Sequence, residues 1–184
     1  MIQRTLVLVK PDAMERGLAG EILARFERVG LRVVNAKVVK ASEELAEKHY
    51  PVTDEWLKKV GGNTLTDCER FGVDVKKTMG TEDPIEIGKL VHKWNKDFLI
   101  SAPILAFVME GIHAIEVVRK LCGTTVPLLA DPGTIRGDYS SNSAISENAQ
   151  KQTIRNLVHS SGSEDEAKRE IALWFGNEVK NKAH

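Results

Sequence analysis

The order in which short apolar runs and helical repeats follow one another is the feature that most restricts the fold of this chain. Four β-branched, apolar runs are typical of strands and cover residues 5–9, 31–39, 103–109 and 154–158. Segments with apolar side chains at helical spacing lie between and after them, at residues 22–29, 42–50, 84–94, 112–121 and 163–174. This order predicts an α+β protein with a ferredoxin-like βαββαβ antiparallel sheet, helices packed on that sheet, and additional inserted helices.

Residues typical of helix ends support these boundaries. Ser42 and the Ser163–Glu166 pair are typical N-terminal caps, and Asp83–Pro84 suits the start of a helix. Gly123 is typical of a helix C-terminus. The consecutive residues 61–63, Gly-Gly-Asn, instead favour a turn inside the least regular part of the chain.

Length and composition indicate one domain spanning residues 1–184. Hydrophobic residues make up 42% of the 184 positions, which is enough for a core at this length. Basic and acidic residues both number 26, and a net charge of zero argues against a broad nucleic-acid or membrane surface. The first residues lead into a strand rather than an apolar signal region, and Cys68 and Cys122 suggest no disulfide framework. We therefore expect a cytoplasmic protein without membrane or nucleic-acid partners.

Phosphate binding, if present, must rely on side chains in this sequence. Gly88-Lys89 is followed by Leu90 and lacks the upstream glycine of a phosphate-binding loop, and there is no G-x-G-x-x-G motif after a strand. Cationic side chains near the ends of predicted elements are the alternative, namely Lys10, Arg119 and Arg136. Each of them, taken singly, is more often a solvated surface charge.

One of the five histidines stands apart from the others. His159 ends a predicted strand and precedes a helix N-terminus, where anions bind favourably. A neutral imidazole is a capable nucleophile, and Glu170 on the following helix could orient the ring. Without further context a structural histidine is the commoner explanation. The remaining histidines fit helical polar faces (His49, His92, His113) or the last position of the chain, where we expect disorder (His184).

Motifs through most of the chain resemble those of nucleoside diphosphate kinases. The strongest are Lys10-Pro11-Asp12, residues 131–138 (DPGTIRGD) and residues 156–161 (NLVHSS). Weaker matches lie at residues 16–22, 41–50, 103–111, 119–127 and 170–175. Their common order leaves little room for coincidence.

The resemblance implies a role for each matching residue. His159 would be transiently phosphorylated, Glu170 would orient it, and Ser161 would flank it. The nucleotide would be bound by Lys10, Arg119, Thr125 and Arg136 at the phosphates and by Asn156 at the ribose, with Tyr50 near the transferred group. Nucleoside triphosphates and diphosphates would exchange a phosphoryl group by a ping-pong mechanism, with Mg²⁺ held mainly by the nucleotide's own phosphates. Members of the family form hexamers or tetramers, so a homo-oligomer is expected.

Three stretches depart from the family pattern. The chain is longer by roughly thirty residues within 51–101, more than an ordinary loop. A shorter polar insertion lies within 139–153, and Gly162 stands where the family usually carries an acidic residue. The family's base-stacking aromatic has no clear equivalent, since Trp56, Trp94 and Phe98 all remain candidates and each is equally well explained as core.

Two other functions stay open on the sequence alone. A family member that binds nucleotides without catalysis is disfavoured by the retained lysine, arginines, asparagine and histidine. A ferredoxin-like module that binds RNA would need aromatic side chains on the sheet in a basic field. In the strands at residues 5–9 and 103–109 the only aromatic side chain is that of Phe107, and the net charge is zero, so the sequence disfavours this function.

Overall fold

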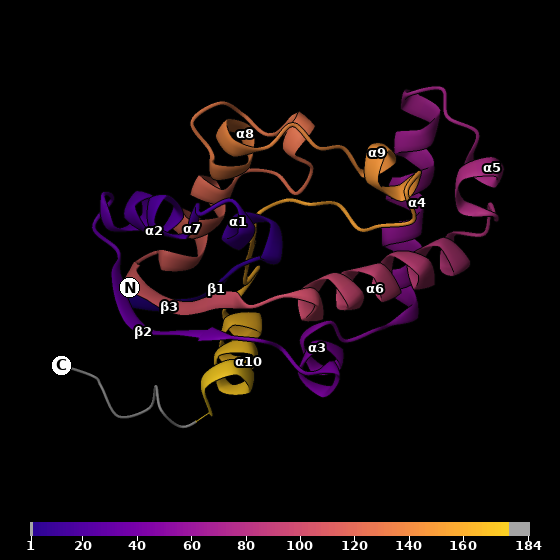
Figure 1. Ribbon diagram of the computed structural model, residues 1–184. Coiled ribbons are helices and arrows are strands. Elements are labelled where there is room, and N and C mark those ends of the chain that lie inside the picture. Colours follow the sequence, from indigo (N-terminus) through magenta and orange to yellow (C-terminus); the bar gives the residue numbers. More distant parts are fainter. Residues whose placement is uncertain (1, 177–184) are drawn as a thin grey trace.

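Four antiparallel strands form one sheet in the computed structural model, which describes residues 2–176 (Figure 1). The strands are β1 (Ile2–Val9), β2 (Arg32–Val39), β3 (Ile104–Ile112) and β4 (Val158–Ser160), in the spatial order β2-β3-β1-β4. Strand β1 pairs along its whole length with β3 and over three residues with β4. This topology confirms the predicted ferredoxin-like α+β fold.

Helices cover both faces of the sheet (Figure 1). On one face, α2 (Ala19–Glu27) and α7 (Ala114–Cys122) pack against Val7 and Val9 of β1. On the other face, α3 (Glu43–His49) and α10 (Glu164–Phe175) pack against Leu6 and Leu8. Because successive strand residues point to opposite faces, the unbroken apolar run of β1 is what a strand between two helical layers requires.

The predicted helix ends agree with the structure at several positions. Helix α6 (Pro84–Ser101) begins after Asp83, whose Oδ1 accepts a hydrogen bond from Glu86 N at 2.9 Å. Helix α10 begins after Ser163, whose Oγ accepts from Glu166 N at 3.2 Å. The reciprocal half of the predicted capping box is different, because the Glu166 carboxylate accepts from Gly162 N rather than from Ser163 N.

The turn predicted at residues 61–63 is wrong, because these residues lie inside α4 (Asp54–Arg70). A side chain on Gly61 would come within 1.9 Å of Pro84 O, and one on Gly88 within 2.4 Å of Leu57 O. The two glycines therefore serve a close crossing of α4 and α6 rather than a turn. The packing of the two helices outweighs the low preference of glycine for a helix interior.

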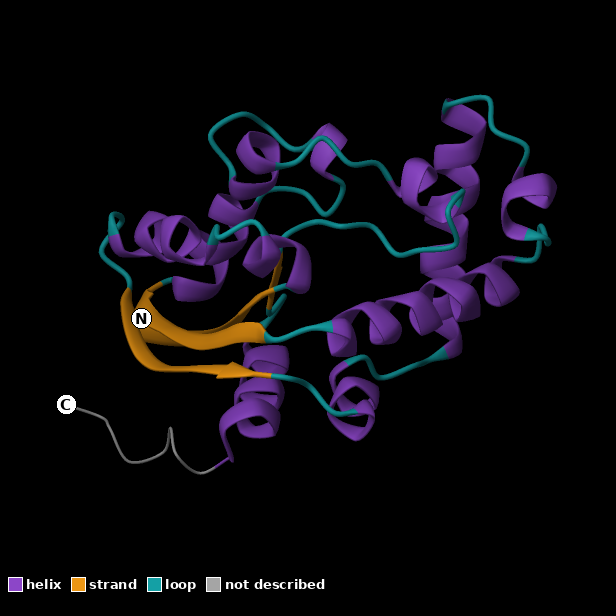
Figure 2. Ribbon diagram, in the orientation of Figure 1, coloured by secondary structure: helices purple, strands orange, loops and turns teal. Residues whose placement is uncertain are grey.

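Short helices occupy several of the segments between the longer elements. They are α1 (Pro11–Glu15), α5 (Val75–Met79), the 3₁₀ turn η1 (Pro127–Leu129), α8 (Ile135–Tyr139) and α9 (Ala144–Asn148). Helix α9 packs against α4, so two stretches that depart from the family pattern contact each other. Figure 2 shows the strands gathered at one side of the molecule and α4, α5 and α6 extending away from them. Within residues 2–176, no helix is both long and apolar enough to span a membrane.

The strand predicted at residues 154–158 is shifted, since β4 covers only Val158–Ser160. The preceding residues do not pair with β1. Several of their backbone groups are held instead by side chains, including Asp12 and Arg136, and Leu157 O accepts from Lys10 N. Polar contacts here replace a regular ladder, which the apolar pattern alone could not reveal.

Candidate active site

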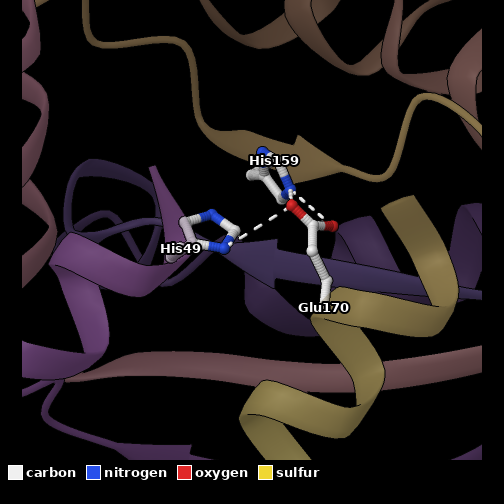
Figure 3. Close-up of side chains that lie close together, drawn as sticks. All are labelled: His49, His159 and Glu170. Atoms are coloured by element: carbon white, nitrogen blue, oxygen red, sulfur yellow. Dashed lines mark hydrogen bonds and ion pairs between the residues drawn. The ribbon is translucent and has the colours of Figure 1, made fainter. Parts of the chain in front are cut away.

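The imidazole of His159 is fixed on one side and free on the other. His159 lies on β4 opposite Leu8, and its Nε2 is 2.9 Å and 3.0 Å from the two carboxylate oxygens of Glu170 (Figure 3). Ser161 Oγ donates to Glu170 Oε2 at 2.6 Å. A carboxylate accepts hydrogen bonds, so Nε2 carries the hydrogen and the lone pair resides on Nδ1. No residue within 2–176 hydrogen-bonds to Nδ1, and the side chain keeps 17% exposure.

The surroundings of His159 favour its neutral form. Burial and the positive charge of Lys10 hold the pKa of His159 well below its ordinary value. Burial also raises the pKa of Glu170, although the Ser161 hydroxyl and the charge of Arg169 oppose that effect. A neutral ring with a free nitrogen is the state that can act as a nucleophile at physiological pH.

Lys10 brings a positive charge to the same end of the sheet. It follows β1 directly, and its Nζ donates to Asn156 Oδ1 at 2.8 Å. Asn156 Nδ2 in turn donates to the backbone oxygen of Thr125 at 2.9 Å. Burial and the neighbouring charge of Arg136 lower the pKa of Lys10 to about 8, against the opposing effect of Asp12. Lys10 is therefore charged near neutral pH, but few negative charges surround it. A bound phosphate would supply the missing negative charge.

Arg136 uses much of its guanidinium to hold the backbone. Its Nε, Nη1 and Nη2 donate to Asn156 O, Gly123 O and Val158 O at 3.0, 2.7 and 2.6 Å. Five N–H donors belong to a guanidinium, so two remain beyond these three bonds. Burial lowers the pKa of Arg136 from its ordinary value. The buried cation thus clamps the segment before His159 and still has donors for an anion.

The other predicted residues surround this centre at different depths. Tyr50 ends α3, is half-buried, and burial raises the pKa of its hydroxyl. Arg119 is exposed on α7, and its Nη1 would lie 3.2 Å from a Cβ placed on Gly162. Thr125 is exposed after α7. The structure therefore brings Lys10 and Arg136 into direct contact with Asn156, three positions before His159, whereas Arg119 and Thr125 are exposed.

His49 is the residue that sequence reasoning missed. The prediction of a polar helical face is wrong, since its side chain is buried and its ring lies edge-on to that of His159 at 4.4 Å between centroids (Figure 3). Trp174 Nε1 donates to His49 Nδ1 at 3.2 Å, so the hydrogen of the neutral His49 ring is on Nε2. Burial lowers the pKa of His49 well below its ordinary value, so its approach to Glu170 at 3.5 Å is not an ion pair at neutral pH. The three-residue spacing from buried Ala46 was the available signal.

The remaining histidines are outside this group or outside the described chain. The polar face predicted for His92 is wrong as well, because its side chain is buried and its Nε2 lies 3.0 Å from Tyr50 O. His113 begins α7 in a left-handed backbone conformation. His184 lies outside the described residues.

Comparison with known proteins identifies the family. A family model described as nucleoside diphosphate kinase matches residues 3–58 and 85–179. The chain belongs to the nucleoside diphosphate kinase family. A nucleoside diphosphate kinase from Pyrobaculum aerophilum is 45% identical over 177 residues, covering 96% of this chain and 97% of that protein. The enzyme from Borreliella burgdorferi is 40% identical over 184 residues, covering 98% of this chain and 92% of that protein.

Solved structures give the same family. The crystal structure of an NDP kinase from Pyrobaculum aerophilum matches with a TM-score of 0.92 and 42% identity, covering 97% of this chain and 98% of that chain. A transition-state mimic of nucleoside diphosphate kinase from Borrelia burgdorferi, with bound vanadate and ADP, matches with a TM-score of 0.76 and 40% identity. That match covers 100% of this chain and 93% of the other. These similarities confirm the predicted family and fold.

The parts of this nucleoside diphosphate kinase that depart from the family pattern can now be placed. The family match leaves out residues 59–84, which contain most of α4 and all of α5. Among the aromatic candidates for base stacking, the Trp56 ring packs edge-on against His92 at 5.8 Å. Trp94 and Phe98 instead line a cavity of about 670 Å³ between α1, α6 and residues 151–155. None of the three is singled out by these contacts.

Gly162 leaves the hydrogen bonds around His159 in place. A Cβ on this residue would come within 2.7 Å of Glu166 Oε2, so the Glu166 carboxylate occupies the space of a side chain at position 162. The same carboxylate accepts a hydrogen bond from Gly162 N at 2.7 Å. An acidic group thus reaches this position from the first turn of α10 instead of from residue 162.

Proposed function

We propose that this chain transfers the terminal phosphoryl group of a nucleoside triphosphate, usually ATP, to nucleoside diphosphates through a phosphohistidine at His159. The observation that carries the proposal is the His159 ring, whose Nε2 is held by Glu170 while Nδ1 makes no hydrogen bond within residues 2–176 and the charge of Lys10 acts on the ring. Membership of the nucleoside diphosphate kinase family supplies the reaction class. The two relatives described above carry that name at 45% and 40% identity over nearly the whole chain.

The ring geometry supports one nucleophilic atom. The lone pair of His159 Nδ1 forms a bond to the terminal phosphorus while the bond from that phosphorus to the bridging oxygen breaks. The electron pair of the broken bond remains on the departing nucleoside diphosphate. The phosphorylated ring keeps its hydrogen on Nε2, and the adjoining Glu170 carboxylate offsets the positive charge that develops on the ring. Attack by a terminal oxygen of a second nucleoside diphosphate reverses these steps.

Positioning and charge stabilisation account for most of the catalysis in such a transfer. We assign the phosphates to Lys10, Arg119 and Arg136, with Thr125 as a further donor. Asn156 is assigned to the ribose and Tyr50 to the vicinity of the transferred group. Support comes from the contact of Lys10 and Arg136 with Asn156, which places two cations beside the segment that carries His159. Ser161 is assigned a supporting role, since it donates to the carboxylate that orients the nucleophile.

The family acts on nucleotides, whose phosphate oxygens bind divalent cations, and we propose Mg²⁺ bound mainly by the substrate phosphates. Within residues 2–176, the one group of three potential metal-binding side chains is His49, His159 and Glu170. Two imidazoles and one carboxylate suit a softer ion, whereas Mg²⁺ prefers oxygen ligands. These three side chains therefore do not suit Mg²⁺, and the ion would instead arrive with the nucleotide, where it would neutralise charge on the phosphates.

We further propose that residues 1–184 form a single domain with insertions within 51–101 and 139–153, and that the chain forms a homo-oligomer, a hexamer or a tetramer. A cytoplasmic location is proposed because Cys68 and Cys122 are both free and buried, as is usual in a reducing compartment. Nucleoside diphosphates and triphosphates are the proposed partners.

A steady-state exchange assay tests the proposed function. Purified protein, ATP, UDP and magnesium should yield UTP and ADP, and double-reciprocal plots at several UDP concentrations should be parallel, as a ping-pong mechanism requires. Absence of UTP would refute the activity, and intersecting lines would refute the covalent route.

A further inference from the structure

The backbone just before His159 makes a turn that is rare for a residue with a side chain. Leu157 has φ of 70°, and Val158 N donates to Asn156 O at 2.8 Å across this single residue. A hydrogen bond of this span with positive φ defines the strained form of the γ-turn. Such a conformation persists only where its surroundings impose it. It reverses the backbone between Asn156 and Val158, directly before His159.

The first turn of α1 holds one side of this γ-turn. Leu157 N donates to Asp12 Oδ2 at 3.0 Å, and Lys10 N donates to Leu157 O at 2.8 Å. The Asp12 side chain is buried, so its hydrogen bond to an amide is shielded from water and assisted by charge. Both polar backbone groups of Leu157 are therefore paired with the segment that also carries Lys10.

Arg136 holds the other side. Its Nε and Nη2 donate to the carbonyl oxygens of Asn156 and Val158 at 3.0 and 2.6 Å. Leu157 thus lies between two charged side chains. Asp12 accepts a hydrogen bond from its N–H, and Arg136 donates to the carbonyl oxygens of the residues before and after it. Loss of either partner would leave buried backbone groups unpaired.

The charge of Asp12 also acts on the cations of the site. It opposes the effect of burial on the pKa of Lys10 and on that of Arg136. The second carboxylate oxygen, Oδ1, is buried without a hydrogen-bond partner among residues 2–176. A buried carboxylate with an unused oxygen is costly to maintain. Two contributions offset this cost: Asp12 accepts a hydrogen bond from Leu157 N, and its negative charge acts on the cations of Lys10 and Arg136.

We propose that Asp12 is a positioning residue for phosphoryl transfer, which imposes the γ-turn at Leu157 and keeps Lys10 charged. This inference rests on the proposed function, because it assigns Asp12 to the same site. Asp12 acts through Leu157 and Lys10 and does not itself meet the nucleotide.

Two substitutions separate the two roles. Asp12→Ala removes both the acceptor and the charge, whereas Asp12→Asn keeps an oxygen that can accept from Leu157 N and removes only the charge. Asp54→Asn is the matched control, since Asp54 is an exposed acid in the first turn of another helix, α4. For each protein, kcat and kcat/KM for the ATP and UDP exchange are measured across pH, together with the thermal unfolding midpoint.

Lys10 is the group whose titration the pH profile reports. It faces Asp12 on α1, Arg136 on α8, His159 on β4 and His49 on α3. Among these, only Asp12 is negative, so its removal should make the ammonium form of Lys10 less stable. The alkaline decline of kcat/KM should then begin at lower pH in Asp12→Asn than in the wild type.

Asp12→Ala should lower kcat per folded molecule roughly 100-fold, as expected for displacement of a reacting group by about 1 Å. Asp12→Asn should recover most of that loss near pH 7 and show the shifted alkaline limb, while Asp54→Asn matches the wild type in both. An unshifted alkaline limb in Asp12→Asn, or an unchanged kcat in folded Asp12→Ala, would overturn the proposal. Should Asp12→Ala not fold, the profile of Asp12→Asn decides alone.

Failure of the proposed function gives a different pattern. The wild type would then show no exchange at all, and the pKa of Lys10 can be followed without activity by NMR of the ¹⁵N-labelled side-chain amine in wild type and Asp12→Asn. A lower Lys10 pKa in Asp12→Asn would support the role of Asp12, and an equal or higher pKa would contradict it.

Discussion

The end of the sheet that carries His159 and the extension formed by α4, α5 and α6 are stabilised in different ways. Around His159, buried polar side chains pair with one another and with the backbone, as Lys10 does with Asn156 and Glu170 with Ser161. In the extension, Gly61 and Gly88 allow two helix backbones to approach closely, and the polar side chains form exposed ion pairs. Buried hydrogen bonds between polar groups therefore stabilise the first region, and close packing of two helices stabilises the second. Substitutions in the two regions should consequently affect different measurements.

The largest expected effect is the loss of turnover in His159→Gln. The amide has no nucleophilic nitrogen, so exchange should fall on the order of 10⁵-fold or more, as removal of a covalent nucleophile does in other enzymes. The surrounding cations are unchanged, so nucleotide binding measured by calorimetry should persist. Substantial residual turnover would show that another group accepts the phosphoryl.

Arg136→Ala should have the next largest effect, because it removes a cation from the proposed phosphate site and also removes hydrogen bonds that stabilise the fold. Three hydrogen bonds to backbone carbonyls are lost, and buried acceptors remain unpaired. We expect a fall in kcat/KM on the order of 100-fold and a loss of roughly 3 kcal/mol in the free energy of unfolding. An unchanged kcat/KM in the folded variant would remove Arg136 from the site.

Neighbouring glycines in α4 provide a matched test of the extension. A Cβ on Gly61 would meet Pro84 O at 1.9 Å, whereas nothing lies within 4 Å of one on Gly62. Gly61→Ala should therefore destabilise the protein by about 3 kcal/mol, and Gly62→Ala should stabilise it by about 0.5–1 kcal/mol through helix propensity. Chemical denaturation measures both values. Equal effects of the two substitutions would show that the close crossing of α4 and α6 is not what stabilises the extension.

Lys10 predicts the pH dependence of the site. Its pKa of about 8 lies below the ordinary 10.5, so the amine is charged at pH 7 and loses its charge as the pH rises through about 8. The kcat/KM of the free enzyme should decline above that pH, up to tenfold per unit. The charged amine is disfavoured in the folded state, so Lys10 makes the free energy of unfolding rise between about pH 8 and 10.5. A flat profile to pH 10 would contradict the role of Lys10 in phosphate binding.

The smallest effect is expected for an ion pair of the extension. Lys93 Nζ lies 2.6 Å from Asp97 Oδ2 on α6, and both side chains are more than half exposed. Lys93→Ala should change the free energy of unfolding by about 0.5 kcal/mol or less and leave exchange activity unaltered. A change above 1 kcal/mol would mean that this exposed pair contributes more than its solvation allows.

The two regions also differ in how well the sequence predicted them. The strands around the sheet centre and the helix ends at Asp83, Gly123 and Ser163 followed from apolar periodicity and capping residues. The Gly-Gly-Asn sequence at residues 61–63 was misleading, because a glycine required by a helix crossing resembles a glycine required by a turn. The two kinds of glycine can be told apart only when the helix that packs against the residue, here α6, is known.

The candidate site shows a similar limit. His159 and Glu170 could be predicted because they lie eleven positions apart at the end of one strand and on the next helix. His49 and Asp12 could not be assigned a place, since their contacts with His159 and Leu157 join positions more than 100 residues apart in the chain. Local patterns report which side chains are buried, but not which buried groups meet.

Mass analysis of the phosphorylated protein tests the central claim most directly. After incubation with ATP and magnesium and removal of nucleotide, the intact protein should carry one acid-labile phosphoryl group, located on His159 by peptide fragmentation and lost on addition of UDP. A protein that gains no phosphoryl group, or that carries one on another residue in a form that UDP cannot remove, would contradict the account.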